Sequence, residues 1–177
     1  LILELKAVET ISLIHEAQLL SYLKSTGLKV GLIINFKVRR LKLGIRRMIL
    51  LDTHVWLWLL HDPSNISESA QAAIQQEEPH NGLLVSAISV WEVAVKSSIG
   101  KLNLHLPINE WYQLAQTHSG IIIEPLSPLD AIYSTQLPGV FHKDPADRIL
   151  VAIARRRSIS LVTCDTKILN YTHIKTI

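Results

Sequence analysis

Short, continuously apolar segments separated by longer segments with helical periodicity constrain the fold of this chain more than any other feature. After Met48 the apolar segments are MILLD, GLLVS, GIIIEPL and SLVTCD. A strand that is apolar on both faces needs cover on both faces, as strands inside parallel sheets have. The alternation therefore predicts an α/β fold with a central, mainly parallel sheet between layers of helices.

The segments between these strands carry helical patterns. We expect helices over THVWLWLLH, SESAQAAIQQE, ISVWEVAVKSSI, INEWYQLAQTH, PLDAIYSTQ and DPADRILVAIARRR, and a turn at DPSN. Gly100 closes one of these helices and Gly120 follows another, as glycine often does at helix ends. The tail HIKTI is a candidate last strand.

Acidic residues fall at element ends that meet at one edge of such a sheet. Asp52 ends the strand MILLD, Asp165 ends SLVTCD, Asp147 lies in the first turn of its helix, and Glu92 lies inside an apolar helix. Sites in open parallel sheets lie outside the carboxyl ends of the strands. Four converging carboxylates repel one another, and a hard divalent cation with oxygen ligands removes that conflict. The pattern therefore predicts a Mg²⁺ or Mn²⁺ site.

Each of these acids also has a structural interpretation. Asp52, Asp144 and Asp165 stand where a helix N-cap stands, and Asp147 favours the helix dipole. A proline directly after Asp144 suits the first helical position, so we favour capping over metal binding for Asp144. The apolar neighbours of Glu92 indicate burial, and a buried carboxylate needs a partner or a metal. For Glu92 we therefore favour a functional role.

Four stretches, MILLDTHVWLWLL, LLVSAISVWEVAVKSSIGKL, HKDPADRILVAIA and LVTCD, make residues 48–177 recognisable. In their order and spacing they resemble the PIN-domain ribonucleases, specifically the VapC-type toxins of bacterial toxin–antitoxin pairs. The resemblance implies a PIN-like three-layer α/β/α fold. It also implies a metal site of Asp52, Glu92 and Asp147, completed or supported by Asp165, with Asp144 as an alternative to Asp147.

The same resemblance implies a cytoplasmic, Mg²⁺- or Mn²⁺-dependent endoribonuclease whose metal-activated water attacks an RNA phosphodiester. VapC-like proteins usually dimerise and are inhibited by a VapB-like antitoxin, so both partners are expected here. The apolar helix THVWLWLLH is a candidate interface, with burial in the core as the alternative. The alternative function is a catalytically idle PIN-fold module that pairs with an antitoxin-like partner. A nucleotide-binding Rossmann domain is excluded because the sequence contains no glycine-rich phosphate loop.

Composition agrees with a location away from membranes. No apolar run reaches the roughly 18 residues that a membrane-spanning helix needs. The single cysteine, Cys164, cannot form an internal disulfide, which suits a reducing cytoplasm.

Further polar residues are candidates for supporting roles. Ser86 and Thr163 are candidates to hydrogen-bond metal-bound waters, or alternatively to satisfy nearby backbone groups. Cationic side chains are candidates to contact the RNA backbone, and those near position 155 also suit a helix carboxyl end. They are Lys96, Lys101, Lys143, Arg148, Arg155 and Arg156.

The chain before Met48 differs in charge from the rest. Residues 1–47 hold nine lysines and arginines against three glutamates, a net charge of +6, whereas residues 48–177 hold nine against twelve acids, a net charge of −3. Such asymmetry marks a composition boundary. We therefore expect a PIN domain over residues 48–177 and a short α/β extension over residues 1–47.

The extension has motifs of its own. LILELKAVE and KVGLIINF predict strands, and HEAQLLSYLKS predicts a helix that ends at a glycine. Together with LKLGIRR they resemble the carboxyl-terminal part of the GxxExxY proteins, a branch of the PD-(D/E)XK nuclease-like fold. Glu4 and Lys6 match its E-x-K motif, and Gln18 and Tyr22 match its Q-x-x-x-Y helix.

The rest of that nuclease motif is absent from the sequence. The family's preceding acid and amino-terminal half are missing, so we expect the extension to be a scaffold remnant without chemistry of its own. Met48 then resembles the native start of a PIN protein. The residues before it would be the tail of an upstream reading frame, either joined in frame to the PIN protein or wrongly assigned to it. A true fusion of the two segments is the alternative.

Overall fold

The computed structural model describes residues 1–8, 11–28, 30–35, 48–80 and 82–177. Contacts divide the chain into two compact parts, unit 1 (Leu1–Arg47) and unit 2 (Met48–Ile177). Within the described ranges, no helix is both long enough and apolar enough to cross a membrane.

Unit 1 consists of two parallel strands and one helix. Strand β1 (Ile2–Lys6) pairs in register with β2 (Gly31–Asn35), and α1 (Leu13–Thr26) connects them. The helix ends at Gly27, whose φ of 66° lies in the left-handed region that glycine adopts at little cost. The predicted strand–helix–strand order is confirmed. The stretch LKLGIRR lies outside the described residues.

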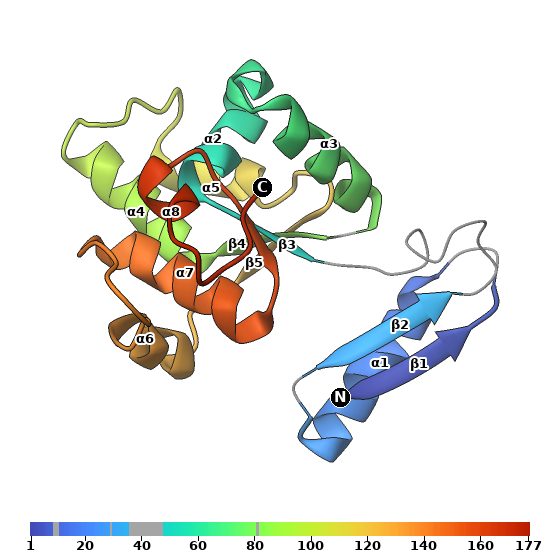
Figure 1. Cartoon of the computed structure of the whole chain (residues 1–177). Coiled ribbons are helices and arrows are strands. Elements are labelled where there is room, and N and C mark those ends of the chain that lie inside the picture. Colours follow the sequence, from blue (N-terminus) through green and yellow to red (C-terminus); the bar gives the residue numbers. More distant parts are fainter. Residues whose placement is uncertain (9–10, 29, 36–47, 81) are drawn as a thin grey trace. The chain divides into compact units, whose positions relative to one another are not determined.

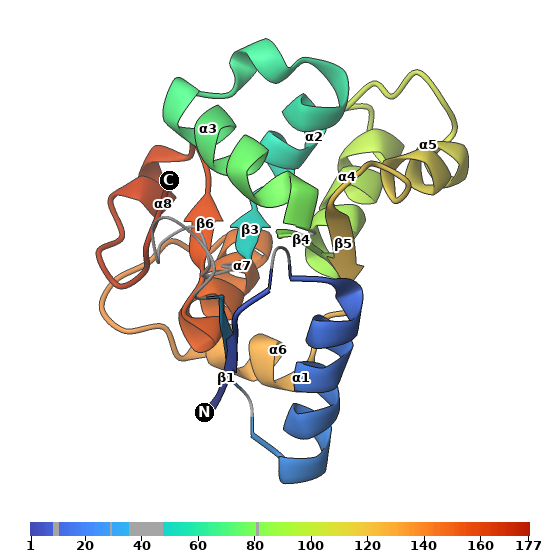
Figure 2. The ribbon, with the colours of Figure 1, turned by 90° about the vertical axis from the view of Figure 1, so that its right-hand side faces the viewer.

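Unit 2 is built on a four-stranded sheet in which every pair is parallel. The strands lie in the order β5-β4-β3-β6, which Figure 2 shows across the middle of the view. Their bounds are β3 (Ile49–Leu51), β4 (Leu83–Ser86), β5 (Ile121–Glu124) and β6 (Ser160–Val162). All four strands were predicted from their apolar runs.

The carboxyl-terminal tail lies beside β6, although it does not form a full strand. An isolated parallel bridge joins Leu161 to Thr176, and the backbone N–H of Ile177 donates to the carbonyl of Leu161 at 3.1 Å. The candidate last strand is therefore reduced to a bridge at the edge of the sheet.

Helices surround the sheet of unit 2, as Figure 1 shows. All six predicted helices are present, and the predicted DPSN turn contains a short 3₁₀ helix. The short helix α8 was not predicted. The helices are α2 (Thr53–His61), η2 (Pro63–Asn65), α3 (Glu68–Glu77), η3 (Glu78–His80), α4 (Ala87–Ser98), α5 (Ile108–Ala115), α6 (Pro128–Thr135), α7 (Pro145–Arg157) and α8 (Thr166–Leu169).

Two hydrophobic cores lie on opposite faces of the sheet, because successive strand residues point to opposite sides. Ile49 and Leu51 pack with buried residues of α2, α3 and α5, whereas Leu50 packs with buried residues of α7 and α8. This arrangement is the three-layer α/β/α fold that the sequence implied.

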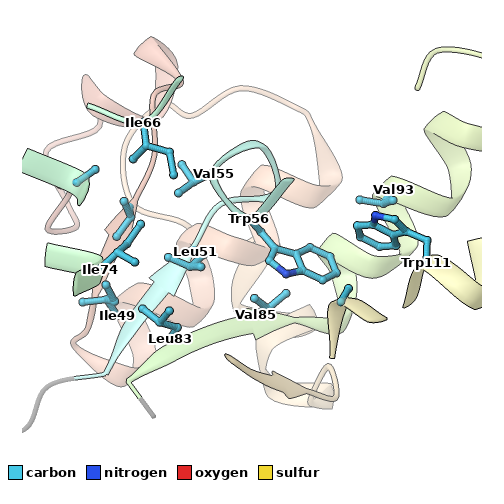
Figure 3. Packing of buried hydrophobic residues seen from close by; sticks show 13 residues of the cluster. Ile49, Leu51, Val55, Trp56, Ile66, Ile74, Leu83, Val85, Val93 and Trp111 are labelled. Atoms are coloured by element: carbon cyan, nitrogen blue, oxygen red, sulfur yellow. The ribbon is translucent and has the colours of Figure 1, made fainter. Parts of the chain in front are cut away.

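Trp56 of α2 anchors the first of these cores (Figure 3). It is fully buried and meets Trp111 of α5 edge to face, with ring centroids 5.0 Å apart. Trp58 on the same helix is half-buried against this core. Burial in the core, the alternative to an interface, is therefore correct for Trp56.

Candidate active site

The acids identified in the sequence come from four elements of unit 2. Asp52 directly follows β3, and Asp165 is the N-cap of α8 (Thr166–Leu169), shortly after β6. Because β3 and β6 are parallel neighbours, both residues lie at the same edge of the sheet. Asp147 lies in the first turn of α7, and Glu92 lies in the middle of α4.

Asp147 shows that these acids converge. Burial, followed by the negative charges of Asp144, Asp52, Asp165 and Glu92, raises its pKa from 3.8 to about 7. The side chain is only 16% exposed, so water screens these charges incompletely. The four other carboxylates therefore lie close enough to Asp147 for their charges to act on it.

Asp52 is held in place by a buried hydroxyl. Its Oδ2 accepts a hydrogen bond of 2.5 Å from Thr163 Oγ1, which in turn accepts one of 3.0 Å from the backbone N–H of Asp165. Burial raises the pKa of Asp52 and Glu92 adds to the rise, while the Thr163 bond and His54 oppose it. Although Asp52 stands at the N-cap position of α2, its side chain does not cap the helix.

Asp144 and Asp165 do cap helices. Asp144 Oδ1 accepts from the backbone N–H groups of Ala146 at 3.0 Å and Asp147 at 3.3 Å. Asp165 Oδ1 accepts from the N–H of Lys167 at 2.7 Å. The capping interpretation of Asp144 is thus the one that the structure shows.

Glu92 pairs with a cation one helical turn away. Its Oε1 lies 2.6 Å from Lys96 Nζ, and its side chain is 14% exposed. Lys96, a predicted RNA contact, therefore belongs to the acid cluster and offsets part of its charge.

A histidine approaches Asp147 from the segment before α7. His142 Nε2 lies 3.3 Å from Asp147 Oδ2, but the geometry does not make a hydrogen bond, and this buried nitrogen has no other hydrogen-bond partner in the described part of the chain. The two groups are therefore neighbours without a fixed bond between them.

The family follows from this fold and these acids together with the sequence. Residues 49–174 match the PIN domain family model. The chain belongs to the PIN-domain family. Over 125 residues it is 32% identical to Ribonuclease VapC22 of Mycobacterium tuberculosis, an alignment that covers 71% of this chain and 92% of that protein. The PIN domain of this chain is therefore of the VapC type.

Solved structures share the fold of this PIN domain. VapBC2 from Rickettsia felis, bound to a DNA fragment from its promoter, has a TM-score of 0.55 at 14% identity, covering 73% of this chain and 97% of that chain. FitAcB from Neisseria gonorrhoeae has a TM-score of 0.52 at 20% identity, covering 73% and 96%. At these identities the likeness concerns the fold alone.

The segment before the PIN domain is similar to a different nuclease group. Residues 1–48 match the PD-(D/E)XK nuclease superfamily model. In unit 1, Lys6 Nζ lies 2.7 Å from Glu4 Oε1 and donates to Gln18 Oε1 at 3.1 Å, and Gln18 Nε2 donates to Tyr22 Oη at 2.7 Å. The four residues that carried the resemblance are therefore linked in one chain of contacts.

Arg148 of the PIN domain supports the backbone near the site. Its Nε donates to the carbonyl of Ser134 at 2.9 Å, and its Nη1 donates to the carbonyls of Phe141 and His142 at 3.3 and 3.1 Å. These bonds favour bracing of the segment before α7 over the RNA contact that the sequence suggested.

The remaining cationic candidates are spread along the PIN domain. Lys101 and Lys143 are exposed, and Lys143 directly precedes the α7 cap. Arg155 and Arg156 lie at the other end of α7, roughly 12 Å along the helix from Asp147 at about 1.5 Å per residue. The structure therefore does not bring these two arginines to the acid cluster.

Hydroxyl groups near the acids differ in what they contact. Ser86 is buried and its Oγ accepts from the N–H of Ile88 at 3.3 Å, so it caps α4, which is the backbone alternative. Thr53 Oγ1 and Ser89 Oγ are buried without a hydrogen-bond partner among the described residues, and neither was a candidate from the sequence. Their positions in the sequence, next to Asp52 and one helical turn before Glu92, could have marked them as candidates.

A divalent cation fits the chemistry of this site. No three His, Cys, Asp or Glu side chains in the described ranges form a preformed metal-binding group. The fit rests instead on the donors: carboxylate oxygens suit a hard cation, and burial together with the charges of nearby acids raises the pKa of Asp147. Thr53 and Ser89, close in sequence to Asp52 and Glu92, add two buried hydroxyl oxygens that have no hydrogen-bond partner among the described residues.

Proposed function

We propose that this PIN domain is a metal-dependent endoribonuclease and the toxin of a type II toxin–antitoxin pair. The observation that carries the proposal is the setting of Asp147, where burial and then the charges of four neighbouring acids raise its pKa to about 7. The 32% identity to Ribonuclease VapC22 supports RNA as the substrate.

In this proposal Asp52, Glu92, Asp147 and Asp165 hold Mg²⁺ or Mn²⁺. A cation of this kind lowers the pKa of a bound water and stabilises charge that develops on a phosphate. The hydrogen bond from Thr163 fixes the orientation of the Asp52 carboxylate.

Other residues of the chain act around these acids. The ion pair with Lys96 holds Glu92 toward the cluster. Exposed Lys101 and Lys143 attract the RNA backbone, because cations that approach phosphates release bound counterions. Asp144 keeps its role as the cap of α7, and Ser86 its role as the cap of α4.

Cleavage of RNA under metal control tests the proposal. The full chain, stripped with a chelator, should cleave RNA only after Mg²⁺ or Mn²⁺ is restored. Asp52→Asn and Asp147→Asn should abolish cleavage while circular dichroism shows the fold intact. Glu110→Gln, which removes an exposed carboxylate on α5, is the matched control and should keep full activity.

The alternative of an idle binding module makes the opposite prediction. It requires that neither metal restores cleavage of tRNA or rRNA, while the protein still binds an antitoxin. Full metal-dependent cleavage by both the Asp52 and the Asp147 variants would show that cleavage does not depend on these acids.

We also propose a VapB-like antitoxin and a second copy of the chain as partners, in the cytoplasm. The antitoxin is supported by likeness to complexes such as VapBC2, and the cytoplasm by the presence of one cysteine, Cys164, in the sequence. Light scattering at micromolar concentration tests the dimer, and a monomer under those conditions contradicts it.

For the extension we propose a scaffold role, with the domain boundary at Met48. Glu4, the acid of its half motif, is paired with Lys6, which also binds Gln18. Glu4→Ala should therefore leave RNA cleavage by the full chain unchanged.

A further inference from the structure

A hollow of about 700 Å³ lies at the carboxyl end of α7, separate from the acid cluster. Its lining comes from α6 and the two residues that follow it, from the end of α7 and the two residues that follow it, and from the tail between Thr172 and Lys175. We refer to it as the α7 pocket.

The ionisable groups that line the α7 pocket are basic or aromatic. Arg155, Arg156, Lys175 and His173 contribute to it together with Tyr133, and none of the described lining residues is acidic. In a unit whose net charge is −3, four basic side chains around one hollow are a local reversal of charge. Such a hollow favours an anion.

Two of these cations are available to a ligand. Arg156 is already committed, because its Nε donates to Asp130 Oδ1 at 2.6 Å and Asp130 is 1% exposed. Arg155 and Lys175 are exposed and make no ion pair with any described residue. Among the described residues, the Arg155 guanidinium makes one hydrogen bond, a long one of 3.5 Å from Nη1 to the carbonyl of His173.

The aromatic lining narrows the chemistry of the anion. Tyr133 is 47% exposed at the pocket, beside the cations. Aromatic rings stack with nucleobases, while arginine and lysine bind phosphates. A phosphate with a base attached satisfies both features, whereas an acidic peptide uses only the cations.

We propose that the α7 pocket binds a phosphate and its nucleotide in the RNA strand, as a contact site away from the acids. This proposal rests on the proposed function only in naming RNA as the strand. Arg155 and Lys175 contact the phosphate, and Tyr133 contacts the base. Since the pocket lies at the opposite end of α7 from Asp147, it holds the strand without taking part in the chemistry.

Binding of a labelled RNA of about 20 nucleotides to the full chain tests this proposal, with chelator present so that nothing is cleaved. The double variant Arg155→Ala/Lys175→Ala should bind about tenfold more weakly at low salt. The slope of log affinity against log salt should become shallower by about 0.7, because the contact to one phosphate of a single strand is lost. Arg156 is left unchanged because its removal would leave the buried carboxylate of Asp130 without its ion-pair partner.

Arg157→Ala is the matched control. Arg157 is the neighbouring cation on α7, does not line the pocket, and pairs with Glu124 of β5. This variant should bind RNA within about twofold of the wild-type chain and keep most of the salt slope. If Arg157→Ala and the double variant lose the same RNA affinity, the loss is a general charge effect and the proposal for the α7 pocket is wrong.

Two other ligands give different outcomes. Adenosine 5′-monophosphate should compete only at millimolar concentration, and micromolar binding that the double variant loses would assign the pocket to a free nucleotide instead of the strand. Unchanged RNA binding combined with a weakened antitoxin complex would assign it to protein and overturn the proposal. Absence of cleavage with metal would refute the ribonuclease but leave this binding result standing.

Discussion

Replacement of Asp147 by asparagine should stabilise the metal-free protein above pH 7. The folded state holds the pKa of this carboxyl at about 7, compared with an ordinary value of 3.8. Between these values the unfolded chain has lost the proton that the folded chain still holds. Stability therefore falls as pH rises from about 3.8 to about 7, and changes little from this group above that range. Asparagine keeps the shape of the side chain and removes this loss.

The structure sets the size of the gain. A shift from 3.8 to about 7 corresponds to at most about 4 kcal/mol, since one pKa unit equals about 1.36 kcal/mol. The side chain is 16% exposed and its repulsion comes from several partly solvated acids, so water screens part of that energy. We expect Asp147→Asn to raise the free energy of unfolding by about 2 kcal/mol at pH 8, and by half of that or less at pH 4.5.

Urea unfolding of the full chain with chelator measures this gain. All four tryptophans lie within residues 48–177, so their fluorescence reports the unfolding of unit 2. Glu110→Gln is the control and should change stability by less than about 0.5 kcal/mol at either pH. Magnesium should stabilise the wild-type protein more than Asp147→Asn, because a cation that binds only the folded state adds to its stability. An asparagine variant that is no more stable at pH 8, or whose gain is independent of pH, would refute the electrostatic reasoning.

Three further changes probe the site and the boundary. Asp144→Asn should keep most of the RNA cleavage that Asp147→Asn loses, because asparagine caps a helix about as well as aspartate; an equal loss in a cleavage assay would make Asp144 a ligand. Thr163→Val should lower the free energy of unfolding in urea by about 1–3 kcal/mol and weaken Mg²⁺ binding in calorimetry, because it leaves the buried Asp52 carboxylate without its hydrogen-bond donor. If both the free energy of unfolding and the Mg²⁺ affinity stay unchanged, Thr163 does not position Asp52. A chain that begins at Met48 should fold and cleave RNA with the same metal dependence. It should bind RNA with a weaker salt dependence, since residues 1–47 carry a net charge of +6. An insoluble or inactive product would show that the PIN domain begins before Met48.

Local sequence patterns were enough to predict the strands and helices of unit 2 and to single out the acids as candidates. Strand and helix patterns depend on neighbours a few residues apart, so MILLD and THVWLWLLH predicted β3 and α2 directly. The cap formed by Asp144 is equally local, because it joins groups within three residues. The isolated bridge that replaces the predicted last strand depends on how the tail pairs with β6, and the local pattern of HIKTI does not predict that pairing.

Which polar groups meet, and how their charges interact, depends on the folded chain. Thr163 and Asp52 are 111 positions apart, and Arg156 and Asp130 are 26 apart, so no local spacing predicts either bond. The charge of Arg148 is evident in the sequence and suggested a phosphate contact. In the folded chain its guanidinium donates to three carbonyls from α6 and the segment before α7. The raised pKa of Asp147 likewise arises from burial and from acids on separate elements, because desolvation and repulsion depend on distances through the fold rather than along the chain.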